Sequence, residues 1–435
     1  RDKWVVRGSY GIFDAPRDAE NYTDGALGLG FNPHNQGGGG YTTGSAAFPL
    51  SVGPPAGTVI FPTVQTLSST FANYSSAEYY PRSMPTVYVE QLLFGVQREL
   101  GRGLLLDTSY VYTRGNNLNF ATDINQATTP GSTAVGGFEC TSFYHCGNPN
   151  PVFNSISAQY YDGYSNYNAL QLRLQKRMSY GLSFQVNYAW SKSLDTGTGN
   201  GHGSGIDVYQ NAYTPSLNYG PSDFNAANTL VGQIIYEVPF GHGRQFTLHG
   251  PLDQIAGGWR VSSLFQWHGG VPFTPVIQSS VAGSIDPGLS PAFAAGSTLY
   301  PEQVGDPSAP HRSHAMWFNP TAFANPADGT FGNTHRNTVI GPGFANVNLS
   351  IAKEFPLHEQ IALEIRGDMF DVFNHINWSN PDANVGFGGT GSTACPLHGP
   401  NAGLLLADCN AGVVTTPINS GIDARIIQLG AHLRF

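Results

Sequence analysis

The feature that most constrains the fold is an alternation of apolar and polar side chains that recurs in ten separate segments. Successive residues of a β-strand point to opposite faces of a sheet, so each segment predicts a strand with one apolar and one polar face. The last segment alternates strictly, and Leu429, Leu433 and the terminal Phe435 share one face. The ten predicted strands are residues 5–12, 86–100, 104–114, 170–177, 182–191, 230–238, 347–351, 361–369 and 424–435, with one more that begins at Trp259.

The connections between these segments alternate in length along the whole chain. Short turns fall at 101–103, 179–181 and 356–359, and a connection of medium length covers 240–258. The other connections are long: four occupy residues 14–85, 115–166, 192–225 and 272–344, and a fifth precedes the last strand. Membrane-spanning barrels have short periplasmic turns and long extracellular loops, whereas a soluble β-sandwich gives no reason for this alternation. We therefore predict an all-β, antiparallel transmembrane β-barrel that forms a single domain over residues 1–435.

Composition excludes several other classes of protein. No apolar run approaches the roughly 20 residues that a spanning helix needs, and 54 glycines with 12% aromatic residues suit strands and turns. The net charge of −9 with only 20 Lys and Arg residues argues against nucleic acid as a partner. We expect no cofactor.

Alternation assigns a side of the barrel to each strand residue. The residues expected to contact lipid are Leu172, Leu174, Phe184, Val186, Leu349, Leu363 and Leu429. Those expected to face the lumen are Gln171, Arg173, Gln185, Asn348, Glu364 and Gln428. Aromatic residues fall into two belts, as in outer-membrane barrels. The expected periplasmic belt is Trp4, Phe240, Trp259, Phe355 and Phe435, and the outer belt is Tyr10, Tyr112, Trp190 and Trp267.

Motifs that resemble catalytic or metal sites lack the partners that such chemistry needs. Asp195-Thr196-Gly197 matches the aspartic-protease triplet, but no second triplet supplies the other carboxylate. His311, His314 and His335 have no accompanying set of ligands for a metal, so solvated loop histidines are the simpler interpretation. We expect no catalytic residues and no metal site.

The four cysteines occur as two local pairs in long loops. Cys140 and Cys146 share one predicted outer loop, and Cys395 and Cys409 share another. The cell envelope is oxidising, so two local disulfides are expected, with free thiols as the alternative.

Several segments resemble the Oar-like TonB-dependent receptors that are abundant in Acidobacteria. The similar segments are 6–13 (VRGSYGIF), 164–171 (YSNYNALQ), 318–320 (FNP), 329–333 (GTFGN), 341–344 (GPGF) and 370–375 (FDVFNH). The resemblance implies a barrel of about 22 strands, of which this chain is expected to supply about ten C-terminal ones. In that family a carboxypeptidase-regulatory-like domain and a plug with the TonB box precede the barrel. The start at Arg1 directly before a strand suggests a fragment that lacks both.

These observations predict an outer-membrane receptor that takes up a ligand by binding and gated passage. The resemblance implies coupling to the TonB complex through the missing plug, and the terminal Phe435 resembles the signal read by the barrel assembly machinery. Outer membrane lipid and a glycan, siderophore, cobalamin or peptide ligand are the other expected partners. Candidate ligand contacts are Tyr160, Tyr161, Tyr164, Tyr209 and Tyr213 in the outer loops and Arg173, Glu364, Arg366 and Asp368 on the lumen wall. The alternative is a passive porin or a structural, adhesive surface protein.

Overall fold

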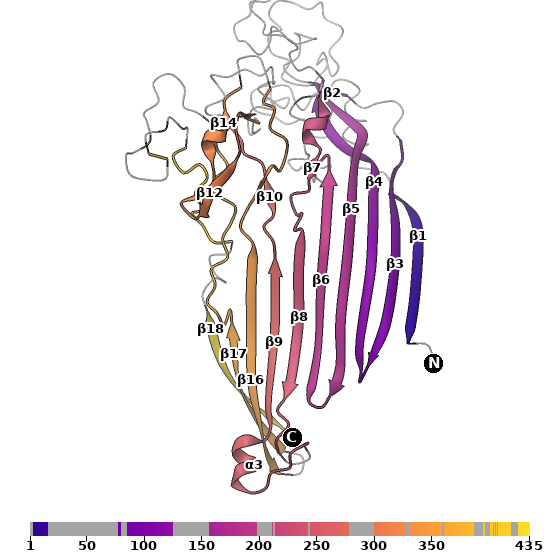
Figure 1. Cartoon of the computed structure of the whole chain (residues 1–435), viewed down its shortest axis with the longest axis vertical. Helices are drawn as coiled ribbons and strands as arrows, with labels where there is room; N and C mark the ends of the chain where they lie inside the picture. Colours follow the sequence, from indigo (N-terminus) through magenta and orange to yellow (C-terminus); the bar gives the residue numbers. More distant parts are fainter. Residues whose placement is uncertain are drawn as a thin grey trace, which may run out of the picture.

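A tall, curved antiparallel sheet dominates the computed structural model of the chain (Figure 1). The structure describes residues 3–15, 77–79, 85–124, 156–197, 211, 214–241, 244–277, 300–326, 331–358, 361–386, 395, 401–402, 404, 406, 408–418 and 425–435. The C-terminus and the short helix α3 (Pro251–Ala256) lie at the lower end of the sheet in Figure 1, and the described parts of the long connections lie at its upper end. No helix among these residues is long and apolar enough to cross a membrane.

Ten strands follow one another through the sheet, and each pairs antiparallel with its neighbours. In order they are β1 (Trp4–Ala15), β3 (Val87–Gly101), β4 (Leu104–Asp123), β5 (Ile156–Ser179), β6 (Leu182–Asp195), β8 (Asn228–Glu237), β9 (Trp259–His268), β16 (Phe344–His358), β17 (Ile361–Phe370) and β18 (Ile426–Arg434). All ten predicted strands are confirmed. Within the described residues β1 pairs only with β3 and β18 only with β17, so the sheet is open, as expected for part of a larger barrel.

Tight turns at the lower end have the backbone that short hairpins require. In the turn between β5 and β6, Tyr180 and Gly181 both have positive φ, at 52° and 75°. Two consecutive positive φ values match the twist of the flanking strands and favour glycine. A Cβ on Gly181 would lie 2.3 Å from the carbonyl oxygen of Glu237, so a larger residue would also displace β8.

Two boundaries of the predicted connections were wrong. The expected loop 115–166 is partly strand, since β4 and β5 stay paired as far as Asp123 and its partner Ser157, with register shifts near Leu118. Each bulge moves one residue to the other face and so conceals the alternation. The expected turn 356–359 was also misplaced, because Pro356 still pairs with Ala362 and β16 continues to His358.

The predicted loop 272–344 contains small sheets with a hydrophobic core. Its strands are β10 (Pro272–Phe273), β11 (Glu302–Gln303), β12 (Ser308–Ser313), β13 (Met316–Phe318), β14 (Phe323–Ala324) and β15 (Val339–Ile340). They pair as β10 with β15, β11 with β14 and β12 with β13. The buried cluster consists of Phe273, Phe318, Ala322, Phe323, Val339 and Val385. We call these strands, with residues 371–386 and 401–418, the outer layer.

Short elements complete the upper end of the sheet. β2 (Ala77–Tyr79) pairs parallel with β5, and β7 (Gly220–Pro221) pairs with the end of β6. Two single turns of 3-10 helix, η3 (Pro215–Asn218) and η4 (Pro320–Ala322), each begin at a proline. Proline suits the first position of a helix because its fixed φ is already helical and its missing N–H would be unpaired there.

Candidate functional site: the polar face and the outer layer

Strand register separates two chemically different faces across the sheet. One row of cross-strand partners is apolar and contains Leu106, Leu174, Val186, Gly232, Phe265 and Val347. The adjacent row, on the opposite face, contains Gln97, Asp107, Arg173, Asn187, Val231, Gln266 and Asn346. All thirteen residues assigned by alternation to lipid or lumen fall on the corresponding apolar or polar face.

Several ion pairs lie on the polar face. Arg173 lies 2.7 Å from Asp107 on the neighbouring strand, and Arg366 lies 2.9 Å from Asp368 on its own strand. Ser350 also donates to Asp368 at 2.6 Å. The candidate residues Arg173, Arg366 and Asp368 therefore neutralise one another or a neighbour, which leaves a polar and nearly balanced surface.

Two further ion pairs each join two strands that are separated by a third strand. Arg260 on β9 binds Glu364 on β17 at 2.9 Å, across β16. Arg434 on β18 binds Glu354 on β16 at 2.6 Å, across β17. The register puts alanine beneath each bridge, because Ala352 is the partner of Arg260 and Ala362 is the partner of Arg434. Sequence reasoning identified Glu364 but missed both arginines, since a pair across two strands leaves no local pattern.

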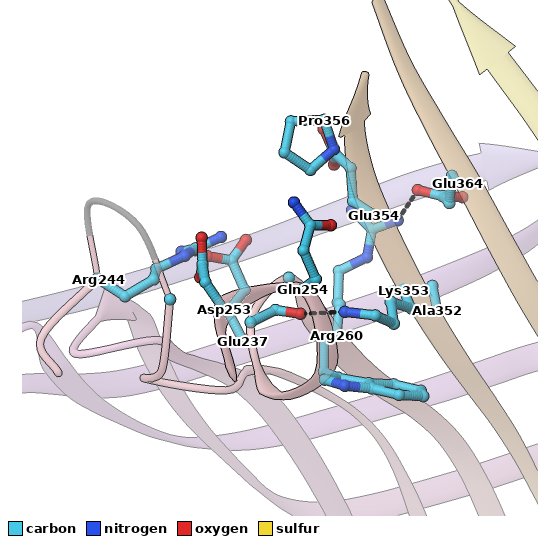
Figure 2. Close-up of a pocket in the computed structure, with 14 residues that line it drawn as sticks. Glu237, Arg244, Asp253, Gln254, Arg260, Ala352, Lys353, Glu354, Pro356 and Glu364 are labelled. Carbon is cyan, nitrogen blue, oxygen red and sulfur yellow. Dashed lines mark hydrogen bonds and ion pairs between the residues drawn. The ribbon is translucent and has the colours of Figure 1, made fainter. Parts of the chain in front are cut away.

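A pocket of about 210 Å³ lies at the lower end of the sheet, beside the connection between β8 and β9. Figure 2 shows Asp253 and Gln254 of α3 beside the charged residues of β9, β16 and β17. Glu237 and Arg244 form an ion pair here, and the Arg260–Glu364 bridge forms another wall. The pocket walls are therefore charged but largely self-neutralised.

A buried arginine joins separate segments at the upper end. Arg336 is only 6% exposed and forms an ion pair with Asp195 at the end of β6. Its other bonds go to Asp223, at 2.9 Å, and to the carbonyl oxygen of Asn218, at 3.0 Å. Asn337 adds a bond to Asp223 at 2.5 Å. We call Arg336, Asp195, Asp223 and Asn337 the outer ion cluster.

The outer ion cluster gives Asp195, the aspartate of the protease-like triplet, a structural role. Asp195 and Asp223 each bind Arg336, so they do not share a proton as catalytic aspartates do. Burial lowers the pKa of Arg336 to about 10, and the guanidinium therefore keeps its charge at neutral pH. Nothing in the sequence indicated this pairing, because Arg336 and Asp195 are 141 positions apart.

The candidate tyrosines lie near the upper end of β5, but they do not form one cluster. Tyr160 stacks on Phe120 with ring centroids 6.2 Å apart, and Tyr161 is buried. Tyr164 is exposed and pairs instead with Tyr219, with centroids 4.9 Å apart. Sequence reasoning missed Tyr219. Tyr209 and Tyr213 lie outside the described residues.

The remaining candidates have diverse surroundings. Cys395 and Cys409 form a disulfide packed on Leu406 and Ala411, whereas Cys140 and Cys146 lie outside the described residues.

His314 packs on Trp378 with centroids 4.3 Å apart. The described part of the chain contains no group of three or more residues that could hold a metal ion. Phe435 follows β18 and is 95% exposed.

A family model described as an outer membrane beta barrel domain matches residues 1–428. The chain belongs to this family. Membership confirms the predicted antiparallel barrel fold and places the protein in the outer membrane. The apolar face of this outer membrane beta barrel domain is therefore its lipid-facing side and the polar face its lumen side. A membrane barrel of this kind agrees with the prediction of a non-enzymatic protein.

The chain is also similar to several solved structures, each at low sequence identity. One is YddB from Escherichia coli, at 11% identity and a TM-score of 0.37, covering 83% of this chain and 34% of that one. Another is FpvA of Pseudomonas aeruginosa bound to heterologous pyoverdines, at 11% identity and a TM-score of 0.38, covering 89% and 29%. The FrpB iron transporter from Neisseria meningitidis has 10% identity and a TM-score of 0.34, covering 82% and 32%. The outer membrane beta barrel domain thus spans about a third of each chain. No curated protein matches it.

Proposed function

We propose that this domain is the barrel of an outer-membrane receptor that binds a ligand at its outer end and passes it through a gated lumen. The observation that carries the proposal is the folded outer layer. Its hydrophobic core and the outer ion cluster hold segments from several long connections in one arrangement. Selective binding benefits from such a preorganised surface, because fewer side chains and loops have to be ordered when the ligand arrives.

The polar face supports the transport part of the proposal. Paired charges and amides give a hydrated wall that a polar ligand can pass without meeting an isolated charge. The resemblance to Oar-like receptors adds coupling to TonB through a plug, together with a glycan or siderophore as ligand. The barrel assembly machinery is the proposed partner that reads Phe435.

Tyr164 and Tyr219 are the aromatic residues that we propose for ligand contact. Their rings form one tilted pair. The backbone of Tyr164 is held to Thr196, because the Thr196 N–H donates to the Tyr164 carbonyl oxygen at 3.1 Å and the Tyr164 N–H donates to the Thr196 hydroxyl at 3.2 Å. A fixed aromatic face at the outer end suits stacking on a sugar ring or a chelate. Tyr160, Tyr161, Arg173, Glu364, Arg366 and Asp368 remain proposed contacts along the ligand's path.

Uptake of labelled probes by whole cells tests the function. Cells with the complete protein are given an oligosaccharide, an iron–siderophore complex or cobalamin, with and without a functional TonB complex. We expect saturable uptake of one probe class that is lost without TonB. Equal, unsaturable entry in both strains would instead show a passive porin, and surface binding without entry would show a structural protein.

Binding of the accepted probe tests the tyrosine pair. Tyr164→Ala and Tyr219→Ala should each weaken binding about two- to tenfold, the equivalent of one lost aromatic contact. The matched control is Tyr180→Ala, because Tyr180 is 79% exposed in a turn at the opposite end of the sheet. Unchanged binding in both variants would exclude the pair from the ligand site.

A further inference from the structure

The connection between β8 and β9 carries apolar side chains that nothing in the described structure covers. In α3, Leu252 is 66% exposed and Ile255 is 69% exposed. Phe240 and Phe246 are also exposed, and their rings lie 5.5 Å apart between centroids. Exposed apolar groups in one short segment mark a contact surface rather than a solvated turn.

The two sides of α3 differ in their surroundings. Asp253 and Gln254 line the charged pocket, whereas Leu252 and Ile255 are not among its lining residues (Figure 2). Residues three apart on a helix lie on the same side, so Leu252 and Ile255 form one apolar surface directed away from the pocket. The helix therefore separates a polar side from an apolar one.

Two hydrogen bonds attach the connection between β8 and β9 to residues on the lipid-facing side of the sheet. Trp259 belongs to that face, and its indole N–H donates to the carbonyl oxygen of Ile255 at 2.9 Å. Lys353, the register partner of Trp259, donates to the carbonyl oxygen of Gly257 at 2.5 Å. The Lys353 ammonium also lies over the Trp259 and Phe355 rings, 5.2 and 4.7 Å from their centroids. The apolar surface of α3 thus continues the lipid-facing surface at its periplasmic end.

Additional strands in the same sheet would not cover this surface. Further strands would join at β1 or β18, the two edges of the sheet. β9 lies between β8 and β16, and α3 directly precedes it, inside the sheet rather than at an edge. Strands added at either edge would therefore leave α3 uncovered.

We propose that α3 and the Phe240/Phe246 ring pair form an anchor in the phospholipid surface at the periplasmic side of the outer membrane. Leu252, Ile255 and the two phenylalanines enter the boundary between headgroups and acyl chains, while Asp253 and Gln254 remain in water. Interfacial helices bind membranes in this way, with the apolar side buried a few ångströms deep. Trp259 and Lys353 supply the aromatic ring and the cation that are enriched at that depth.

Spin-label accessibility tests the anchor in the complete protein, reconstituted in vesicles of phosphatidylethanolamine and phosphatidylglycerol. Leu252→Cys, Ile255→Cys and Gln254→Cys are labelled separately, and the unsubstituted protein supplies the background from native cysteines. The ratio of collisions with oxygen to collisions with a water-soluble nickel complex should be several-fold higher at Leu252 and Ile255 than at Gln254. Gln254 is the matched control, because it lies on the same helix and is also exposed.

Two results would overturn the proposal. Equal access of the nickel complex to Ile255 and Gln254 would place α3 in periplasmic water. Low access of both reagents to Ile255 would place it against another protein. As a second measurement, Ile255→Asp should lower the temperature at which the barrel loses its folded form in vesicles, while Gln254→Asp should leave it unchanged. Equal temperatures for the two variants would also contradict the anchor.

Discussion

At the scale of single residues, Arg336 has the largest predicted effect on stability. Arg336→Ala leaves Asp195 buried with no cation, and breaking a buried ion pair from one side costs about 3–5 kcal/mol. Hydrogen exchange of the backbone around Asp195 and Asn218 should therefore become faster by two to three orders of magnitude. Mass spectrometry of the folded barrel measures this directly.

The matched control for Arg336 is Arg312→Ala. Arg312 belongs to the same outer layer but is exposed, and it lies over the Trp317 ring at 6.0 Å. Loss of the Arg312 side chain should change the rate of backbone hydrogen exchange around Asp195 and Asn218 only slightly. If the two variants exchange alike, the outer ion cluster does not hold the layer together.

The sequence predicted features that depend on neighbouring residues, and it did not predict contacts between residues far apart in the chain. Arg173 and Glu364 were assigned to the polar face because alternation is a local pattern. Their partners Asp107 and Arg260 were missed, because a sequence does not show which strand lies opposite. Tyr219 was missed for the same reason, since its contact with Tyr164 joins the connection between β6 and β8 to β5.

At the scale of elements, β6 tests the assignment of faces. Spin labels at Val186 and Gln185 should report lipid and water respectively, because these neighbours lie on opposite faces of the strand. Collision rates with oxygen and with a water-soluble reagent measure the difference. The reverse result would mean that the register is shifted by one residue.

Strands were predicted where the period of two is unbroken and missed where it is interrupted. β6 shows an uninterrupted alternation and was found over residues 182–191. The outer part of β4 was missed, because Asn117 has a φ of 57° and bulges separate the paired residues around it. The strands of the outer layer, β10 to β15, are mostly two or three residues long, too short to show a period.

At the scale of the whole molecule, the open edges predict how residues 1–435 behave when expressed alone. β1 and β18 each present a row of backbone groups without a partner strand among the described residues. In hydrocarbon every unpaired group costs several kcal/mol, so the open sheet should aggregate or be degraded. The amount of heat-modifiable protein in outer-membrane fractions measures this. Recovery of a monodisperse, transporting barrel would instead show a complete pore of ten strands.

The outer ion cluster also limits the order in which the protein assembles. Asp195 leaves β6 and Arg336 approaches β16, yet the two side chains meet beyond the same end of the sheet. Each of these segments must reach the cell surface before the bond forms, and contacts between distant positions form slowly. The cluster therefore closes late, after the segment that follows β6 and the segment that precedes β16 have both reached the cell surface.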